Sequence, residues 1–442
     1  MIKLPEQVNK AICLLKNSGF EAYAVGGAVR DCLLGKVPFD WDITTSARPE
    51  ETKKVFCGER IIETGIKHGT VTVIIDGMPL EITTYRIDGD YTDHRHPQTV
   101  SFSDNLRDDL SRRDFTINTL CCNCDDKIID AFGGKDDLNN KIIRCVGDPD
   151  TRFSEDALRI MRAVRFSAEL GFTIEKSTSD SILKNRQLLS DVSKERLQVE
   201  FTKLITGKYA TDVIRKYYAV IEVFIPELAP LAECEQHTKY HKYDVFEHTL
   251  HAVDAIDFND RILRLTMFFH DFGKPDAKTT DENGTSHFKG HAVISEKKTR
   301  DILKRLKFDN NTTNEVSKLV LIHDMKSPRD KIQAKKMMCS LGDEAYLNLI
   351  KIKRADNMAK ADPHAIDEKL KNMRSFYEEI KASNECYNLK SLAVNGDDIK
   401  AFGIAEGKEI KSSLDFLLNG VIEGKCQNRK DVLLEYLKEN TK

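Results

Sequence analysis

Twenty residues, 26–45 (GGAVRDCLLGKVPFDWDITT), constrain the fold of this chain more than any other stretch of its sequence. They predict a Gly-Gly turn that opens a short helix, followed at once by a strand that carries Asp40 and Asp42. Because strand side chains alternate between two faces, carboxylates two residues apart point the same way. Such a pair suits Mg²⁺, which prefers oxygen ligands and keeps coordination positions open for phosphates.

The glycines in front of this strand have the properties of a phosphate-binding turn. Gly26 and Gly27 let the backbone approach an anion closely, and the helix start behind them presents free N–H groups. Arg30 and Asp31 follow in the first turns of that helix. Together with the carboxylate pair, these residues predict a site for a nucleoside triphosphate and its metal. A surface turn before a solvated acidic strand is the alternative, which the ordered combination within twenty residues disfavours.

Length and composition indicate a multidomain globular protein. A chain of 442 residues exceeds one ordinary core, so two to four domains are expected. No run of about 18 apolar residues occurs, which predicts no membrane span. The N-terminus predicts an amphipathic helix and no signal peptide, so the 11 cysteines are expected to be reduced in a cytoplasm. A net charge of −3 disfavours indiscriminate coating of nucleic acid but allows a local basic face.

The periodicity of the chain changes after its first third. Residues 21–145 predict short strands and two helices, including a hairpin of 69–76 and 79–88 around an Asp-Gly turn. Residues 89–105 are polar and lack periodicity, which predicts a mobile loop. From residue 153 onward the spacing of apolar residues is helical.

These patterns predict an α+β protein, with a small N-terminal mixed β-sheet head followed by an elongated all-α C-terminal region. Eight of the 12 histidines fall between residues 237 and 323, which indicates a second site in a domain of its own. The predicted domains are a head, a helical neck, a histidine-rich domain and a helical tail, at residues 1–145, 146–235, 236–360 and 361–442.

The pattern GG…RD…LLG…DxD in residues 26–42 resembles the nucleotidyltransferase superfamily of DNA polymerase β. More closely, it resembles the class II tRNA nucleotidyltransferases (CCA-adding enzymes) and the bacterial poly(A) polymerases, over residues 20–205 almost continuously. The resemblance implies template-independent addition of CMP, CMP and AMP to tRNA 3′ ends by two-metal transfer with Mg²⁺. It makes Asp40 and Asp42 metal ligands. Glu81 is a candidate third carboxylate, although an ordinary exposed strand glutamate explains it equally well.

A second motif of the family matches RRDFTIN at residues 112–118. The resemblance implies that Arg113 and Asp114 contact the ribose, whose 2′-OH distinguishes NTP from dNTP. Asn118 is expected to support the triphosphate side of the pocket. A surface ion pair would explain RRD in isolation, but its place after the DxD strand favours function.

EDALRIMRAVRF at residues 155–166 carries an Asp–Arg pair on a predicted helix, Asp156 and Arg159, whose spacing puts both on one face. The carboxylate can accept from the exocyclic amine of C or A while the guanidinium donates to the adjacent ring nitrogen. G and U reverse that order. A surface salt bridge is the alternative, and the match to the family's EDxxR motif favours base selection. Glu155 is expected to orient the pair and Arg162 to add a contact.

The remaining similarity includes one further motif and two departures. KERLQVEF at residues 194–201 resembles the family's fifth motif, so Arg196 and Glu200 are expected to support the base-selecting helix. Phe39 and Trp41 flank the first carboxylate, where relatives often have Lys and an aliphatic residue. Neither departure removes a chemical group that the mechanism needs.

Histidines and aspartates of the second half match the H…HD…D arrangement of the HD phosphohydrolase superfamily. The matched residues are His248, His270, Asp271 and Asp356. Such a set can bind a divalent metal that activates water, and the resemblance implies phosphoester hydrolysis, including that of 2′,3′-cyclic phosphates, in some members. His291 and His323 are further candidates, as in HD domains that hold two metals. The identity of the metal stays open.

The implied partners are tRNA, CTP and ATP, with Lys and Arg of the helical half holding tRNA phosphates. An A-adding enzyme and a poly(A) polymerase stay open as alternatives, although the chain lacks a basic C-terminal extension typical of the latter. The intact segment 89–105 disfavours a CC-adding specialist. A different class is a phosphohydrolase whose main activity lies in the HD site; a pure RNA-binding protein would not require the carboxylate pair. The oligomeric state stays open, and no membrane partner is expected.

Overall fold

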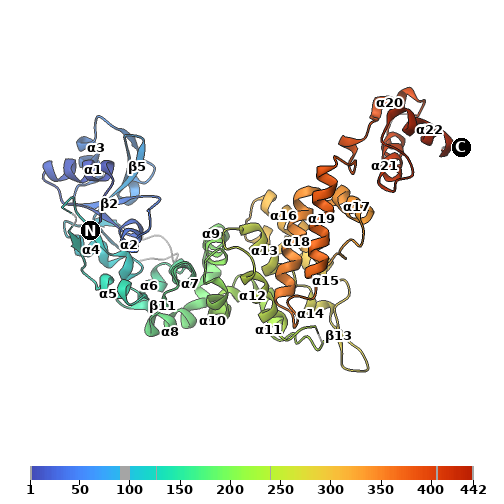
Figure 1. Cartoon of the computed structure of the whole chain (residues 1–442). Helices are drawn as coiled ribbons and strands as arrows, with labels where there is room; N and C mark the ends of the chain where they lie inside the picture. Colours follow the sequence, from blue (N-terminus) through green and yellow to red (C-terminus); the bar gives the residue numbers. More distant parts are fainter. Residues whose placement is uncertain (1, 90–99, 126, 239, 405–406, 441–442) are drawn as a thin grey trace. The chain divides into compact units, whose positions relative to one another are not determined.

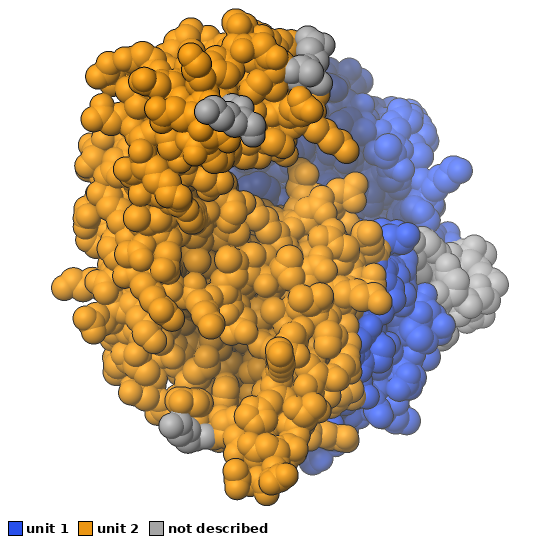
Figure 2. All heavy atoms as spheres, turned by 90° about the vertical axis from the view of Figure 1, so that its right-hand side faces the viewer, with its two compact units in different colours: residues 1–228, 305–307 blue, residues 229–304, 308–442 orange. Residues whose placement is uncertain are grey.

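The computed structural model describes residues 2–89, 100–125, 127–238, 240–404 and 407–440. The chain divides into two compact units, which comprise residues 1–228 with 305–307 and residues 229–304 with 308–442 (Figure 2). Unit 1 combines a β-sheet with helices, and unit 2 is almost wholly helical (Figure 1). The predicted α+β fold is confirmed.

Unit 1 is built on a seven-stranded mixed sheet with the order β3-β4-β5-β2-β1-β8-β9. Within it β2 and β5 are parallel, and the other neighbouring strands are antiparallel. Its strands are β1 (Ala22–Val25), β2 (Asp42–Thr45), β3 (Arg60–Ile62), β4 (Thr70–Ile75), β5 (Met78–Thr84), β8 (Cys121–Cys122) and β9 (Ile128–Ile129). Two small pairs are formed by β6 (Arg86–Asp88) with β7 (Val100–Phe102) and β10 (Ile142–Ile143) with β11 (Thr173–Ile174).

The hairpin β4–β5 confirms the turn predicted from the sequence. Asp76 and Gly77 both have positive φ, 47° and 83°, as a two-residue hairpin loop requires. The second strand ends at Thr84, earlier than predicted, and residues 86–88 form the separate strand β6. Of the predicted loop 89–105, residues 100–102 form β7, and residues 90–99 lie outside the described residues.

Helices cover this sheet and continue into the rest of unit 1. The predicted N-terminal helix is present as α1, whose apolar stripe Val8, Ala11, Ile12 and Leu15 is buried where α1 packs against β1. The helices of unit 1 are α1 (Glu6–Asn17), α2 (Gly27–Leu33), α3 (Pro49–Val55), α4 (Leu106–Ser111), α5 (Gly134–Asn139), α6 (Pro149–Glu155), α7 (Leu158–Leu170), α8 (Lys176–Asn185), α9 (Lys194–Ile205) and α10 (Ala210–Glu222).

The helix predicted from residue 153 is interrupted at Asp156. This residue is extended (φ −136°, ψ 100°) between α6 and α7. Its carboxylate accepts a hydrogen bond from the backbone N–H of Leu158 at 3.1 Å, a local bond through which Asp competes with helix formation. Gly171 ends α7 with φ 70°, as the sequence predicts.

Unit 2 is a set of packed helices, with one small hairpin of β12 (Thr279–Thr280) and β13 (Ser286–His287) that the sequence did not predict. Helix α12 packs against α13 and α18, and α13 packs against α16. The last three helices have a core of their own around Ile399, Leu417 and Leu433. The helices are α11 (Ala229–Ala232), α12 (Val245–Asp254), α13 (Arg261–Phe269), α14 (Lys274–Ala277), α15 (His291–Arg305), α16 (Asn310–Ile322), α17 (Lys331–Leu341), α18 (Asp343–Met358), α19 (Asp367–Ala382), α20 (Gly396–Ala401), α21 (Lys408–Ile422) and α22 (Lys430–Asn440).

Across both units, none of the described helices combines the length and the apolar character needed to cross a membrane.

Candidate active sites

The parallel pairing of β2 and β5 sets Asp42 directly opposite Glu81. Val25 of β1 pairs with Asp42 from the other side, and residues paired in this way project from the same face of a sheet. Both carboxylates line a cavity of about 210 Å³, together with Ile43, Thr70, Thr83, Arg86, Arg112 and Arg113. The register therefore supports Glu81 as a partner of Asp42, which the sequence alone left undecided.

Asp40 lies outside the strand, so the prediction of one strand carrying both carboxylates is wrong. β2 begins only at Asp42, because β1 ends opposite it at Val25. On the other side, Pro79 stands two residues before Glu81 and has no N–H to donate to a longer ladder. Asp40 is exposed in the connection that precedes β2.

Burial and the neighbouring charges at this cavity change the pKa of Asp42. Burial raises the pKa of Asp42 to about 6; Arg113 opposes the rise, and Glu81 and Asp40 add to it. The residue as a whole nevertheless keeps an exposed surface, so its carboxylate is accessible from the cavity. Hard oxygen donors that repel one another fit a divalent cation, whose charge relieves the repulsion.

Gly26 and Arg113 stand beside this carboxylate. Gly26 has φ 83°, and a Cβ added to it would lie 3.3 Å from Nη1 of Arg113 and 3.7 Å from Oδ2 of Asp42. Arg113 is itself held by the fully buried Asp109 of α4 at 3.4 Å, and Asp109 also accepts from the Thr44 hydroxyl at 2.9 Å. Asp109 was not among the predicted site residues, although its spacing of four residues from Arg113 is a usable signal.

Four residues that the resemblance implicates form one buried network. Arg30 donates to Asn118 at 2.8 Å, and Asn118 donates to Asp114 at 3.0 Å from the short 3₁₀ helix Thr116–Asn118. Arg162 of α7 contacts the same carboxylate at 2.6 Å. Burial alone would raise the pKa of Asp114, but Arg162 and Asn118 hold it well below its usual range. The network joins α2, the RRD motif and α7, and protein donors occupy the Asp114 carboxylate.

Asp156 and Arg159, which are predicted to select the base, are fixed by partners outside the pair. Arg196 of α9 contacts both oxygens of Asp156, at 2.9 and 3.2 Å. Arg159 donates to Glu155 at 2.7 Å and to the backbone carbonyl of Arg112 at 2.7 Å. Glu155 therefore holds Arg159, one member of the pair.

Helix α9 supports α7 through ion pairs made by two of its residues. Besides the contact of Arg196 with Asp156, Glu200 lies 2.6 Å from Arg165 and 4.0 Å from Arg162. The two α9 residues thus pair with α7 and its preceding turn, which agrees with their expected supporting role.

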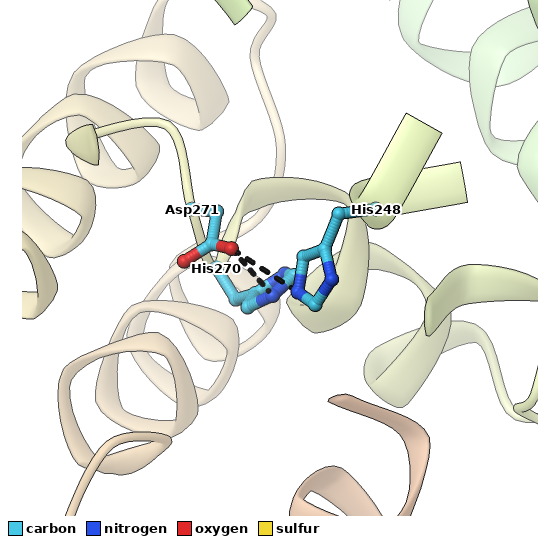
Figure 3. Close-up of side chains that lie close together, drawn as sticks. All are labelled: His248, His270 and Asp271. Carbon is cyan, nitrogen blue, oxygen red and sulfur yellow. Dashed lines mark ion pairs between the residues drawn. The ribbon is translucent and has the colours of Figure 1, made fainter. Parts of the chain in front are cut away.

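A second cluster lies within unit 2, where His248 of α12 and His270 at the end of α13 turn toward Asp271 (Figure 3). Their Nε2 atoms are 3.4 and 3.1 Å from Oδ2 of this carboxylate. Asp356 of α18 completes the set, with Oδ1 3.0 Å from Nε2 of His248. The structure therefore brings together all four residues of the predicted H…HD…D set.

Asp271 also faces a second pair of imidazoles. The Nε2 atoms of His291 and His323 lie 3.4 and 3.8 Å from Oδ1 of Asp271 and 3.1 Å from each other. One carboxylate oxygen thus faces each histidine pair, and both groupings have the spacing of metal ligands.

The four histidines share one orientation. Each Nδ1 lies within hydrogen-bonding distance of a backbone carbonyl oxygen, and an Nδ1–H donated there leaves Nε2 as a lone-pair donor. The distances are 3.2 Å for His248 to Ala359, 2.6 Å for His270 to Met267, 2.8 Å for His291 to Phe288 and 2.6 Å for His323 to Val320. Among the described residues, Nε2 of His270 and Oδ1 of Asp271 are buried without a hydrogen bond of good geometry. This donor set fits a divalent metal.

Two lysines that the sequence analysis missed touch the carboxylates of this cluster. Lys274 lies 2.7 Å from Asp271, and Lys360 lies 2.6 Å from Asp356. Burial alone would raise the pKa of both carboxyl groups, but the adjacent imidazoles and these lysines hold it well below its usual range. The spacings of three and four residues from the predicted ligands are signals that sequence reasoning could have used.

A cavity of about 440 Å³ opens beside the cluster, and His323 and Asp356 form part of its wall. Its cationic lining residues are Lys326, Arg329, Lys353, Lys360 and Lys369. The cavity therefore suits an anionic group next to the candidate metal ligands.

Comparison with known families extends over most of the chain. Residues 22–144 match the family described as Poly A polymerase head domain. Residues 171–231 match "Probable RNA and SrmB- binding site of polymerase A", and residues 279–437 match a tRNA nucleotidyltransferase domain 2.

Full-length relatives are equally consistent. The CCA-adding enzyme of Lactobacillus helveticus is 33% identical over 443 residues, which cover 99% of this chain and 98% of that protein. The CCA-adding enzyme of Geobacillus stearothermophilus is 34% identical, with 97% and 95% covered. The crystal structure of the Bacillus stearothermophilus CCA-adding enzyme in complex with CTP is 30% identical and superimposes with a TM-score of 0.69, covering 99% of this chain and 97% of that one.

Proposed function

The chain belongs to the family of CCA-adding enzymes, and on that premise we propose that it adds CMP, CMP and AMP, from CTP and ATP, to the 3′ end of tRNA. The observation that carries the proposal is the strand register that sets Asp42 against Glu81 in a cavity shared with Arg113. No nucleic-acid template is needed, because protein side chains select the base.

The transfer step follows from the residues around this cavity. The terminal 3′-hydroxyl oxygen of tRNA attacks the α-phosphorus of the nucleotide, a new P–O bond forms, and the bond to the β-phosphate breaks to release pyrophosphate. Asp40, Asp42 and Glu81 would hold Mg²⁺, which when bound favours deprotonation of the hydroxyl and neutralises charge on the phosphates. Arg113, fixed by Asp109, supplies a preorganised cation for the nucleotide.

Base selection rests on Asp156 and Arg159. The carboxylate of Asp156 would accept from the amine of C or A, and the guanidinium of Arg159 would donate to the neighbouring ring nitrogen. Arg196 and Glu155 support these roles because they hold the two side chains, while each carboxylate oxygen has a second lone pair and the guanidinium has further N–H groups for a base. Gly26, Gly27 and the network of Arg30, Asn118, Asp114 and Arg162 would shape the nucleotide pocket around them.

Incorporation by the purified full-length protein with Mg²⁺ tests this function. The substrates are tRNA transcripts that end at the discriminator base, after one C, or after two, with CTP, ATP or both. Addition of C, C and A to the shortest transcript, followed by a stop, is expected. Addition of A alone to the longest transcript would identify an A-adding enzyme, and long A tails a poly(A) polymerase. No incorporation on any transcript would contradict nucleotidyl transfer.

The cluster in unit 2 favours a second function, a metal-dependent phosphohydrolase activity. We propose that His248, His270, Asp271 and Asp356 hold a divalent metal whose bound water attacks a phosphoester, and that His291 and His323 extend the site. Support comes from the buried imidazole and carboxylate atoms that converge within ligand spacing and from the cationic cavity beside them.

Metal content and hydrolysis test the second function separately. Protein purified without chelator is expected to carry at least about one divalent ion per chain and to hydrolyse 2′,3′-cyclic AMP. His270→Asn should lose both properties, whereas His287→Asn, an exposed histidine of unit 2, should keep them. Metal content that is unchanged in His270→Asn would contradict the assignment.

A further inference from the structure

Two apolar side chains stand in solvent immediately before the carboxylates of unit 1. Val37 is 95% exposed and Phe39 is exposed in full. Among the described residues the next large apolar side chain, Val293, is only 62% exposed. Trp41, two residues after Phe39, is 5% exposed, so this connection buries one aromatic ring and leaves the other uncovered.

The position of Phe39 distinguishes it from the scattered apolar residues of an ordinary surface. It directly precedes Asp40 and stands three residues before Asp42, so its Cα lies within about 11 Å of that of Asp42. A nucleotide whose 3′-hydroxyl reaches Asp42 and Glu81 brings its base within reach of an aromatic ring at this place.

We propose that Phe39 stacks on the 3′-terminal base of the tRNA whose hydroxyl reacts. This inference rests on the proposed nucleotidyl transfer. The incoming base is read through its hydrogen-bonding edge by Asp156 and Arg159, so it needs no further selection at Phe39. The terminal base of the primer is the discriminator base in the first round of addition and C in the two later rounds. Stacking on an aromatic ring tolerates such change, because every base presents a π-face.

The experiment places 2-aminopurine at the 3′ end of a tRNA primer and follows its fluorescence on binding to the full-length protein. Stacking on Phe39 is expected to quench the fluorescence. Phe39→Ala should abolish the quench and raise KM for tRNA roughly 5- to 100-fold, while KM for CTP and ATP changes less than about twofold. Phe39→Trp should keep the quench and a KM near that of the wild type.

Matched variants make the result specific. Phe258→Ala removes an exposed ring of unit 2 that is 43% accessible and should change neither the quench nor any KM. Phe39→Lys replaces the ring with a cation, so it should lose the quench while the dependence of tRNA binding on salt becomes steeper by about one unit of slope. Since no described residue covers Phe39, Phe39→Ala and Phe39→Lys should fold, and the single tryptophan, Trp41, reports the integrity of the head in both.

Three results would overturn the proposal: no quench with the wild-type protein, a quench that survives in Phe39→Ala, or an increase confined to KM for CTP or ATP. The last result would place the ring on the incoming nucleotide. The fluorescence measurement needs no turnover. A failure of incorporation would therefore count against the proposed function, whereas a failure of quenching in an active enzyme would count against Phe39 alone.

Discussion

The two candidate sites differ in the secondary structure that positions their residues and in the chemical groups that they bring together. In unit 1 a register between strands brings carboxylates together beside fixed arginines, at a cavity open to solvent. In unit 2 the ends and faces of helices bring imidazoles around one carboxylate, Asp271, which is 1% exposed. The first arrangement suits a polyanion that enters and leaves in each round of reaction. The second suits a cation that stays, because its ligands are oriented by backbone carbonyls before any ion arrives.

The largest expected effect is a double dissociation between the two sites. Asp42→Asn should lower nucleotide incorporation at least about 10³-fold, because it removes the charge of a proposed metal ligand. The same variant should leave hydrolysis of 2′,3′-cyclic AMP within about twofold of the wild type. His270→Asn should show the reverse pattern. Parallel rate measurements on both variants check the comparison.

Controls for this dissociation come from each unit. Asp76→Asn changes an aspartate of the head that sits in a left-handed turn, which Asn tolerates, and should keep full incorporation. His287→Asn serves unit 2 in the same way. Loss of both activities in either site variant would show that the two sites are coupled.

A smaller effect concerns the ion pairs of unit 1. Asp114→Asn should destabilise the folded protein by about 3 kcal/mol at pH 7, because Arg162 loses the carboxylate at 2.6 Å and keeps only Glu200 at 4.0 Å. The folded-state pKa of Asp114 lies below the unfolded value of about 4, so its contribution is present above that pH and is lost as pH falls further. Urea unfolding followed by Trp41 fluorescence should therefore show a smaller difference between variant and wild type at pH 2 than at pH 7.

The surface pair of Asp212 and Arg215 provides the control. Asp212→Asn removes a carboxylate that is 78% exposed in the same unit, and should cost less than about 0.5 kcal/mol. An equal cost for Asp114→Asn would contradict the role given to the buried network.

Acid should change the stabilities of the two units in opposite directions, by a smaller amount than the substitutions above. Burial lowers the pKa of His323 to about 3, with the neighbouring His270 and His291 adding to the effect and Asp271 opposing it. The unfolded histidine, with a pKa near 6.5, then binds a proton first, so stability is lost as pH falls from about 6.5 toward 3. In unit 1 the raised pKa of Asp42 acts in the opposite direction, because the folded state binds the proton first.

Between pH 7 and pH 5 we therefore expect chelator-treated protein to lose about 1–2 kcal/mol of unit 2 stability, whereas unit 1 gains about 1 kcal/mol from Asp42. The raised pKa of His270 offsets part of the loss. Far-UV circular dichroism follows the helices, and Trp41 fluorescence follows the head. Equal shifts of the two urea midpoints would contradict the contrast between the units.

The smallest expected effect concerns base selection. Arg196→Gln should free the Asp156 carboxylate to adopt other positions, and we expect discrimination of CTP against UTP, measured as the ratio of kcat/KM, to fall about fivefold. Lys203→Gln, an exposed cation of the same helix, should leave the ratio unchanged. A fall in both variants would point to a general weakening of RNA binding.

Local chemistry made much of this molecule predictable. The Asp76–Gly77 turn, the stop of α7 at Gly171 and the change from strands to helices all depend on residues close in sequence. The four histidine and aspartate positions of unit 2 were predictable through their resemblance to a known arrangement. What remained undecided or wrong depends on distant partners or on competing local bonds.

Glu81 depends on a distant partner: the pairing of β2 with β5 sets it opposite Asp42, and this pairing was not visible in the local sequence. Asp40 is a related case, because the strand begins where its neighbour ends. Asp156 depends on a competing local bond: its helical periodicity was clear, yet its own carboxylate bonds the backbone and breaks the helix.

The parallel pairing of β2 with β5 affects the order in which the head folds. The strands β4 and β5 are adjacent in the sequence, so their hairpin can form within about 1–10 μs. The pairing of β2 with β5 instead requires closure of the long intervening segment, which costs more chain entropy. Asp42 and Glu81 therefore meet late in the folding of the head, after its local structure is complete. During synthesis the pair cannot form until β5 has emerged from the ribosome, and β8 and β9, which complete the sheet beside β1, emerge later still, so a growing chain completes its nucleotide site only after the whole sheet has been made.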